Sequence, residues 1–203
     1  MTIQKPNKHE LKTKETRELL LQAAEKIFVR DGYEGAELGE IAALAGRTKG
    51  AIYAQFKSKE DIFLALVEEH AMDNKAHMEK ALAVSTSIEQ NRKALRQFYL
   101  KLSEDQAWTL LMLEFKLFAI RHPEAKKRLQ SLVAKLIASS HEKRLVEILG
   151  PVGKGKETIS RSLAIQLMQS LLCGLTLEAR FEPDLLREET LKNVVGRLFD
   201  ALI

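Results

Sequence analysis

The sequence predicts an all-α protein, and three observations support this prediction. The 203 residues are rich in Ala, Leu, Glu, Lys and Arg, which favour helices, and only four prolines and ten glycines interrupt them. No run of β-branched residues lies between turn residues, as a strand would require. Hydrophobic residues make up 45% of the chain, which is enough to fill a core and argues against a disordered chain.

The first predicted helix spans residues 16–31. Its apolar side chains recur at the i, i+4, i+7 and i+8 spacing that forms one stripe along a helix. These side chains belong to Leu20, Ala24, Ile27 and Phe28. Gly32 follows the stripe and suits the left-handed backbone conformation at which many helices end.

Two short helices are predicted next, over residues 38–45 and 48–56. Gly46 provides the turn between them, and Thr48 is a candidate N-cap for the second helix. Two helices joined by a short turn that contains glycine form a helix-turn-helix, in which the second helix can enter the major groove of DNA. The sequence therefore predicts a DNA-binding element near its N-terminus.

The segment around this turn is locally cationic. Four cations and no acid lie between Ala42 and Lys59, although the net charge of the whole chain is only +4. Such a local positive field on a short exposed helix suits phosphate binding. A solvated loop between two helices of a bundle is the alternative interpretation of the same residues.

The first 14 residues carry several lysines and a single acid, Glu10. The lysines are Lys5, Lys8, Lys12 and Lys14. We expect these residues to form a flexible basic arm, which can follow the DNA backbone or the minor groove. A solvated tail without a partner is the alternative.

A fourth helix is predicted to begin at Ser58 and to continue to about Lys80. Ser58, with Asp61 three residues later, resembles a capping box. Five further helices are predicted, over residues 88–103, 106–121, 123–149, 157–180 and 184–202. We therefore expect an N-terminal domain over residues 1–57 and a C-terminal helical bundle over residues 58–203, joined mechanically by the fourth helix.

Cysteine content and hydropathy bear on the compartment of the protein. Cys173 is the single cysteine, which excludes an internal disulfide and fits a reducing environment. The N-terminal residues lack the apolar segment of a signal peptide, and no apolar run is long enough to span a membrane. We expect a cytoplasmic protein with no membrane partner.

Two patterns point weakly to other chemistry. Residues 150–156 fit part of a phosphate-binding loop, but Glu157 stands where a Ser or Thr is needed to hold Mg²⁺. His70, Asp73 and His77 share one face of a helix, but no further ligand completes a metal site. The sequence therefore predicts neither an enzyme nor a cofactor or metal site.

A set of motifs near the N-terminus carries a family resemblance. The motifs are Phe28 with Gly32-Tyr33, Ile41-Ala42 with Ala45-Gly46, Thr48-Lys49-Gly50-Ala51-Ile52-Tyr53 with Phe56, and Ser58-Lys59-Glu60. In this order and at these spacings, residues 16–62 resemble the N-terminal domain of the TetR family of bacterial transcriptional regulators. The rest of the chain matches the family only in length and helical character.

The resemblance implies that residues 48–55 form a recognition helix that enters the major groove. It also implies that the Tyr53 hydroxyl contacts one phosphate and that Lys59 binds another. The residues implied to face DNA are Arg47, Thr48, Lys49, Gly50, Ala51, Tyr53, Gln55 and Lys59. Of these, Ala51 is placed to touch a thymine methyl group.

The sequence departs from the family pattern at three places. Ala36-Glu37 stands where the family usually has a threonine that contacts phosphate, and Gly39 stands where a cation is common. Arg47 replaces an apolar turn residue. Two roles for Arg47 stay open, because it can restore the lost phosphate contact or contact a guanine.

One short helix contacts too few base pairs for useful specificity, so we expect a homodimer on a palindromic DNA operator. The resemblance implies a ligand-responsive repressor whose C-terminal bundle binds a largely apolar small-molecule effector. The alternative is a helical small-molecule carrier or interaction protein with a weakened DNA-binding head. The sequence does not distinguish a repressor from an activator.

Two sets of apolar residues are predicted to carry the functions of the C-terminal bundle. The predicted effector pocket consists of Phe98, Trp108, Leu111, Met112, Phe115, Phe118, Gln166 and Met168. The predicted dimer interface consists of Leu171, Leu175, Val194, Val195, Leu198, Phe199 and Leu202. Two apolar helices can pair with their copies as a four-helix bundle, and an ordinary intramolecular core is the alternative for both sets.

Overall fold

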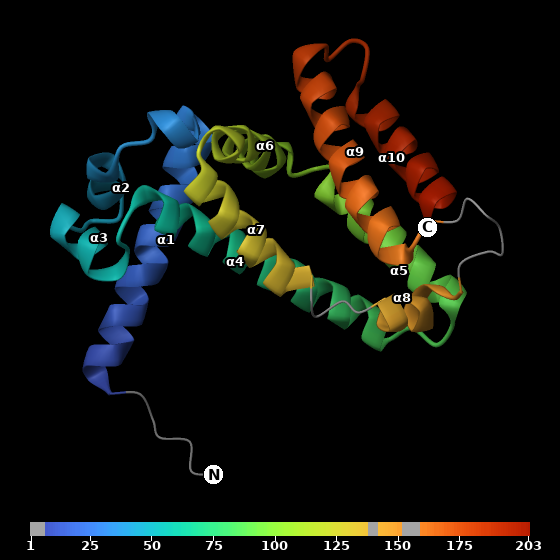
Figure 1. Cartoon of the computed structure of the whole chain (residues 1–203), viewed down its shortest axis with the longest axis horizontal. Coiled ribbons are helices and arrows are strands. Elements are labelled where there is room, and N and C mark those ends of the chain that lie inside the picture. Colours follow the sequence, from blue (N-terminus) through green and yellow to red (C-terminus); the bar gives the residue numbers. More distant parts are fainter. Residues whose placement is uncertain (1–6, 138–141, 152–158) are drawn as a thin grey trace. The chain divides into compact units, whose positions relative to one another are not determined.

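The structure is a computed structural model that describes residues 7–137, 142–151 and 159–203 (Figure 1). Within these residues it contains ten α-helices and no strand, so the predicted all-α class is confirmed. The chain divides into two compact units, Met1–His70 and Ala71–Ile203. The division falls inside one long helix, 13 residues beyond the domain boundary that the sequence predicted at residue 57.

The first unit contains α1 (Lys8–Gly35), α2 (Leu38–Leu44), α3 (Lys49–Gln55) and the first part of α4 (Lys59–Ala83). α1 contacts both α2 and α3, and α2 contacts α3. Every residue of the stripe predicted for the first helix is buried. The core centres on three aromatic rings, Phe28, Tyr33 and Phe63, whose centroids lie 5.4–5.8 Å apart.

The first helix begins earlier than the sequence predicted. The Asn7 side chain accepts a hydrogen bond from the Glu10 N–H at 2.9 Å, and the Glu10 carboxylate accepts one from the Asn7 N–H at 2.8 Å. This capping box starts α1 at Lys8. The prediction of a flexible arm is therefore wrong for residues 8–14, which are helical, whereas residues 1–6 lie outside the description.

The fourth helix begins as its capping residues predicted. The Ser58 hydroxyl accepts a hydrogen bond from the Asp61 N–H at 3.1 Å, and the Asp61 carboxylate accepts one from the Lys57 N–H at 2.8 Å. Four side chains of its first turns are buried, namely Ile62, Phe63, Leu66 and Val67. Because Phe63 packs on the rings of Phe28 and Tyr33, the first part of α4 belongs to the N-terminal unit.

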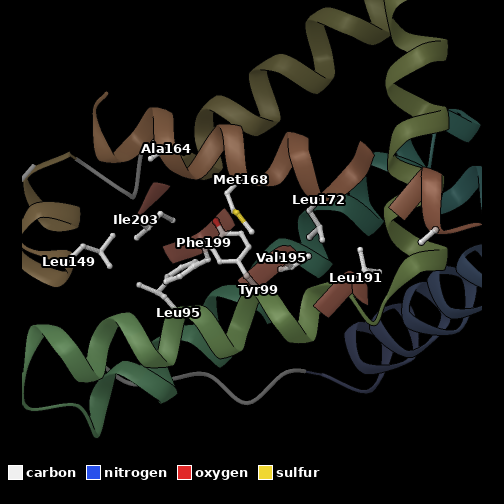
Figure 2. Close-up of a cluster of buried hydrophobic side chains, with 11 residues drawn as sticks. Leu95, Tyr99, Leu149, Ala164, Met168, Leu172, Leu191, Val195, Phe199 and Ile203 are labelled. Atoms are coloured by element: carbon white, nitrogen blue, oxygen red, sulfur yellow. The ribbon is translucent and has the colours of Figure 1, made fainter. Parts of the chain in front are cut away.

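The second unit is a helical bundle around one apolar cluster. Its helices after α4 are α5 (Ile88–Leu102), α6 (Gln106–Arg121), α7 (Pro123–Ile137), α8 (Glu142–Leu149), α9 (Arg161–Phe181) and α10 (Glu188–Leu202). Figure 2 shows the cluster, to which α5, α9 and α10 contribute most of the side chains. Its labelled members are Leu95, Tyr99, Leu149, Ala164, Met168, Leu172, Leu191, Val195, Phe199 and Ile203.

Some predicted helix limits in this unit differ from the structure. The single helix predicted over residues 123–149 corresponds to α7 and α8, and residues 138–141 between them lie outside the description. α9 begins at Arg161 instead of residue 157, because the Ser160 hydroxyl accepts a hydrogen bond from the Leu163 N–H at 3.1 Å and caps the helix there. α10 begins at Glu188 instead of residue 184.

Gly150 ends α8 with a positive φ of 83°, the left-handed conformation that is common directly after a helix. Most of the phosphate-loop pattern, residues 152–158, lies outside the described residues.

The single cysteine, Cys173, is buried in α9. α9 is also the one helix in the described ranges that is long and apolar enough to cross a membrane by length and composition alone. In this structure α9 contacts α6, α8 and α10.

Glu25 of α1 and His70 of α4 form a link that predicts a pH-dependent stability. Their side chains lie 2.8 Å apart, and the hydrogen bond from His70 holds the pKa of the Glu25 carboxyl below its usual value. A carboxyl whose pKa is depressed on folding stabilises the protein above its unfolded pKa, and this contribution is lost as the pH falls through the folded pKa. We expect Glu25→Gln to lower the unfolding free energy at pH 7 by only about 0.5 kcal/mol, because the pair is partly exposed.

The measurement is urea denaturation of wild type and Glu25→Gln between pH 7 and pH 3. The difference in unfolding free energy should shrink towards zero at the acid end, where Glu25 is protonated and resembles glutamine. Glu18→Gln, which removes an exposed carboxylate on the same helix, is the matched control and should show a smaller effect at pH 7. A Glu25→Gln difference that is independent of pH would contradict the assignment.

Candidate nucleic-acid interface

The turn between α2 and α3 is built from local backbone hydrogen bonds. Gly46 has a φ of 63°, which a residue with a Cβ adopts only at a cost. The Arg47 N–H then donates to the Ala42 carbonyl at 2.8 Å, and the Thr48 hydroxyl accepts from the Ala51 N–H at 3.3 Å. The sequence prediction of a helix-turn-helix with Thr48 as its N-cap is therefore confirmed.

α3 has one buried face and one solvent face. Ile52 and Phe56 point into the first unit with exposed fractions of 1% and 4%, whereas Tyr53 is 60% exposed. The Arg17 guanidinium lies 4.4 Å from the centroid of the Phe56 ring, a cation–π contact that α1 makes with the end of α3. Burial and this contact hold α3 with its opposite face towards solvent.

The predicted DNA-facing residues differ in exposure. Thr48, Lys49, Gly50 and Tyr53 are exposed, whereas Arg47, Ala51, Gln55 and Lys59 are half-buried. The Arg47 guanidinium donates to the Gly46 carbonyl at 3.2 Å and so folds back on the turn. One of its nitrogens is engaged in this way, and the choice between a phosphate and a guanine contact for Arg47 stays a prediction.

Gly39 takes on a clear role once the position of Lys49 is known. A Cβ placed on Gly39 would lie 2.7 Å from Cε and 3.2 Å from Nζ of Lys49. The Lys49 side chain therefore crosses the space that a side chain at position 39 would fill. The cation that the family pattern places on the second helix is absent, but an ammonium from α3 lies beside the same backbone.

Lys59 does not stand free to meet a phosphate. Its ammonium donates to the carbonyls of Glu34 and Ala36 at 2.8 and 3.1 Å, and it lies 5.0 Å from the centroid of the Tyr33 ring. In this arrangement Lys59 ties the start of α4 to the end of α1 and to Ala36, which follows α1. The structure therefore differs from the expectation that Lys59 is directed at DNA, because two of the three ammonium donors bind the protein itself.

Sequence reasoning missed the contacts that fix α2 and α3 on α1. Arg30 pairs with Glu40 across α1 and α2 as well as with its neighbour Asp31, and its hydrogen bond holds the pKa of the Asp31 carboxyl below its usual value. Arg17 and Lys59 make the other contacts of this kind. These side chains were visible only as charges in the sequence, and nothing in their spacing indicated these partners.

The predicted effector-pocket residues are distributed between core and surface. Met168 lies in the apolar cluster, and Leu111 and Phe115 are also buried. Gln166 instead lines a groove of about 650 Å³ between α6, α7 and α9. Packing in the protein core, the alternative role for this set, is therefore observed for Met168.

The predicted dimer interface needs a correction. Val195 and Phe199 have exposed fractions of 0% and 1%, and both lie in the apolar cluster of the second unit (Figure 2). A partner subunit cannot contact them in this structure. Leu171 is exposed, and Leu175, Leu198 and Leu202 are partly buried against the same cluster.

This geometry defines a helix-turn-helix protein whose second helix presents a lysine and a tyrosine to solvent. Residues 20–66 match the model of the family described as "Bacterial regulatory proteins, tetR family". The N-terminal unit therefore contains a domain of this family. The matched residues run from the first buried leucine of α1 to the last buried leucine of the first turns of α4.

Curated relatives agree over the same region. The chain is 49% identical over 53 residues to the HTH-type transcriptional repressor BepR of Brucella suis. This alignment covers 26% of the chain and 25% of BepR. It is 34% identical over 101 residues to the HTH-type transcriptional activator FasR of Mycolicibacterium smegmatis. This alignment covers 49% of the chain and 46% of FasR. The matches thus span between a quarter and a half of these relatives, all of which are named as regulators and not as enzymes.

A solved structure extends the likeness to the whole fold. The transcriptional regulator FadR of Bacillus subtilis, in complex with stearoyl-CoA, has a TM-score of 0.68 to this chain at 21% identity. The alignment covers 92% of this chain and 98% of FadR. At this identity the comparison establishes the shared all-helical fold, including the C-terminal bundle.

The position of Lys59 predicts how its loss would affect DNA binding. We expect Lys59→Met to lower the unfolding free energy by about 1–2 kcal/mol, because two carbonyls lose a charged donor. DNA affinity should also fall, but the slope of log affinity against log salt should stay unchanged, because no phosphate contact is lost. Lys57→Met removes an exposed lysine two residues away and is the matched control for stability.

Two measurements on each variant decide the point, a thermal unfolding curve and a salt titration of DNA affinity. A direct phosphate ligand would give the opposite pattern to the one expected. Its loss would leave the melting temperature intact and reduce the salt slope by about 0.9 for each phosphate contact.

Proposed function

We propose that this protein is a sequence-specific transcriptional regulator that binds a palindromic operator as a homodimer. The observation that carries this proposal is the orientation of α3, which anchors Ile52 and Phe56 in the core and presents Thr48, Lys49 and Tyr53 to solvent. A helix held in this way can enter the major groove with its polar face directed at the bases. Repression is the expected outcome, by analogy with BepR, which is named as a repressor.

The proposed division of labour on the DNA follows from exposure. Tyr53 and Lys49 are suited to phosphates, since a hydroxyl and an ammonium both donate to phosphate oxygens. Ala51 and Gln55 are half-buried, and we assign them to base edges. α3 has seven residues and is about 10 Å long, so one copy spans only a few base pairs. Specific binding therefore requires a second copy of the helix.

An exposed apolar stripe on α9 supports the homodimer. Its members leave a large part of each side chain in contact with solvent, and they are Leu163, Leu167, Leu171, Leu177 and Phe181. The opposite face of the same helix buries Ala164, Met168 and Leu172 in the core. An exposed stripe of this kind is typical of a protein interface. We propose that α9 pairs with its copy, and that this stripe replaces Val195 and Phe199 in the predicted interface.

The proposed regulation is thermodynamic coupling between the two units. An effector that binds the second unit more tightly in a conformation with unsuitably spaced recognition helices lowers the affinity for the operator. α4 contains residues of both units and is the proposed transmission element. FadR of Bacillus subtilis, which shares the fold, was solved with stearoyl-CoA, whose acyl chain supports an effector with a large apolar part here.

A second candidate function is a helical small-molecule carrier with a weakened DNA-binding head. The observation that favours it is the start of α2, where Glu37 is the N-cap and makes no capping hydrogen bond through its side chain. The usual threonine would supply both the cap and a phosphate contact. The Lys49 ammonium beside Gly39 weighs against this candidate, because it returns a cation to the same place.

Selection of bound duplexes from a random DNA pool tests the proposed function. We expect a palindromic consensus bound by two chains, with an affinity that falls steeply as salt rises, because several phosphate contacts release counterions. The control is the Gly46→Val variant, which strains the turn at its positive φ without any predicted clash and should select no consensus. Binding that is weak, salt-sensitive and without a consensus would contradict the regulator and leave the carrier.

The dimer interface gives a second prediction. We expect Leu167→Glu to convert the protein to a monomer in sedimentation velocity, because it places a charge within the apolar stripe of α9. Operator affinity should fall by about a hundredfold or more, since the two helix-turn-helix units then bind independently. Val84→Glu is the matched control, because Val84 is exposed and lies outside this stripe. A Leu167→Glu protein that stays dimeric would contradict the assignment of α9.

A further inference from the structure

The groove between α6, α7 and α9 has the dimensions of a small-molecule site. Its volume is about 650 Å³, within the range of about 300–1,000 Å³ that is usual for ligand pockets. α6 leads directly into α7 (Figure 1). Gln166 of α9 also lines the groove. All three helices belong to the second unit.

The walls of the groove are mostly apolar. Ala119 and Leu129 form a buried floor, and Val133 lies one turn further along α7. Ile120 lines the same groove with 65% of its side chain exposed. Covering such side chains with a hydrocarbon is favourable by about 25 cal/mol for each Å² of apolar surface removed from water.

The charges of the groove all have one sign. Lys116 of α6 and Lys126 of α7 line it, and they stand on either side of the α6–α7 connection. No Asp or Glu is among the lining residues. In the described part of the chain, neither lysine is recorded in a salt bridge with a carboxylate. The Gln166 amide is the other polar group at the groove and can donate a hydrogen bond to an anion.

We propose that this groove binds a small amphiphilic anion, with a hydrocarbon part and one carboxylate or similar head group. The hydrocarbon lies along Leu129 and Val133, and the head group lies between the ammonium groups of Lys116 and Lys126. An anion is selected because it satisfies both cations, whereas a neutral ligand leaves them to water alone. The identification of this ligand as the effector rests on the proposed function, but binding itself does not.

Titration calorimetry on the full chain without DNA tests the site, with decanoate as the probe. Decanol and decyltrimethylammonium have a carbon chain of the same total length as decanoate. Decanol is neutral, and decyltrimethylammonium carries a positive charge. We expect one decanoate to bind per chain, and decanol to bind at least about tenfold more weakly, because it lacks the charge-assisted bonds. The decyltrimethylammonium cation should give no measurable binding.

Variants locate the binding in the groove. Lys116→Gln and Lys126→Gln should each weaken the affinity for decanoate by about tenfold and leave the affinity for decanol unchanged. Ala134→Trp, which places a large ring in the groove, should abolish binding of both probes. Lys101→Gln removes an exposed lysine of α5 and is the matched control. Unfolding curves establish that each variant is folded. Undetectable decanoate binding, or decanoate binding that survives in a variant carrying both Lys116→Gln and Lys126→Gln, would overturn the site.

A separate measurement keeps the site distinct from the proposed function. Affinity for the selected operator is measured with and without saturating decanoate. A loss of operator affinity that Lys116→Gln and Lys126→Gln abolish would support both the site and its role as effector site. Decanoate that binds in the groove and leaves operator affinity unchanged would support the site and overturn its regulatory role.

Discussion

A seven-residue helix has no stability of its own in water, so α3 exists because the N-terminal unit buries Ile52 and Phe56. The rings of Phe28, Tyr33 and Phe63 form the centre of that unit, and Arg17 covers the outer side of Phe56. The proposed DNA-binding surface therefore takes its geometry from the apolar core of the N-terminal unit. A change that loosens this core alters the position of α3 before it alters any residue that faces the DNA.

Lysines of the same unit have different environments, although their sequence contexts look alike. The Lys59 ammonium is held by two carbonyls and a tyrosine ring, whereas the Lys49 side chain crosses the open space above Gly39. A local excess of positive charge thus contains structural and ligand-directed cations together. Under the proposed function, we expect the exposed lysines to supply the salt-dependent attraction of DNA, because they are placed to contact phosphate and release its counterions.

The C-terminal unit uses α9 on two sides. Its inner face fills the core with Met168 and Leu172, and its outer face leaves Leu167 and Leu171 in solvent. A helix that is apolar on both sides satisfies the composition test for a membrane span, but its inner face packs against neighbouring helices of the bundle. The outer face is the surface that we propose to pair with a second copy. The groove between α6, α7 and α9 is a different surface. Lys116 and Lys126 make it positively charged, whereas the outer face of α9 is apolar.

The sequence alone determined the all-α class, the helix-turn-helix and the capping residues Ser58 and Thr48, because these depend on contacts within a few positions of each other. It also placed the apolar stripe of α1 correctly. The tertiary structure decided which groups Lys59 binds, because its carbonyl partner on Glu34 lies 25 residues away in the chain. It also decided that Phe199 is buried in a core shared by several helices. Periodicity identifies an apolar face, but which partner covers that face depends on packing between segments that are distant in the chain.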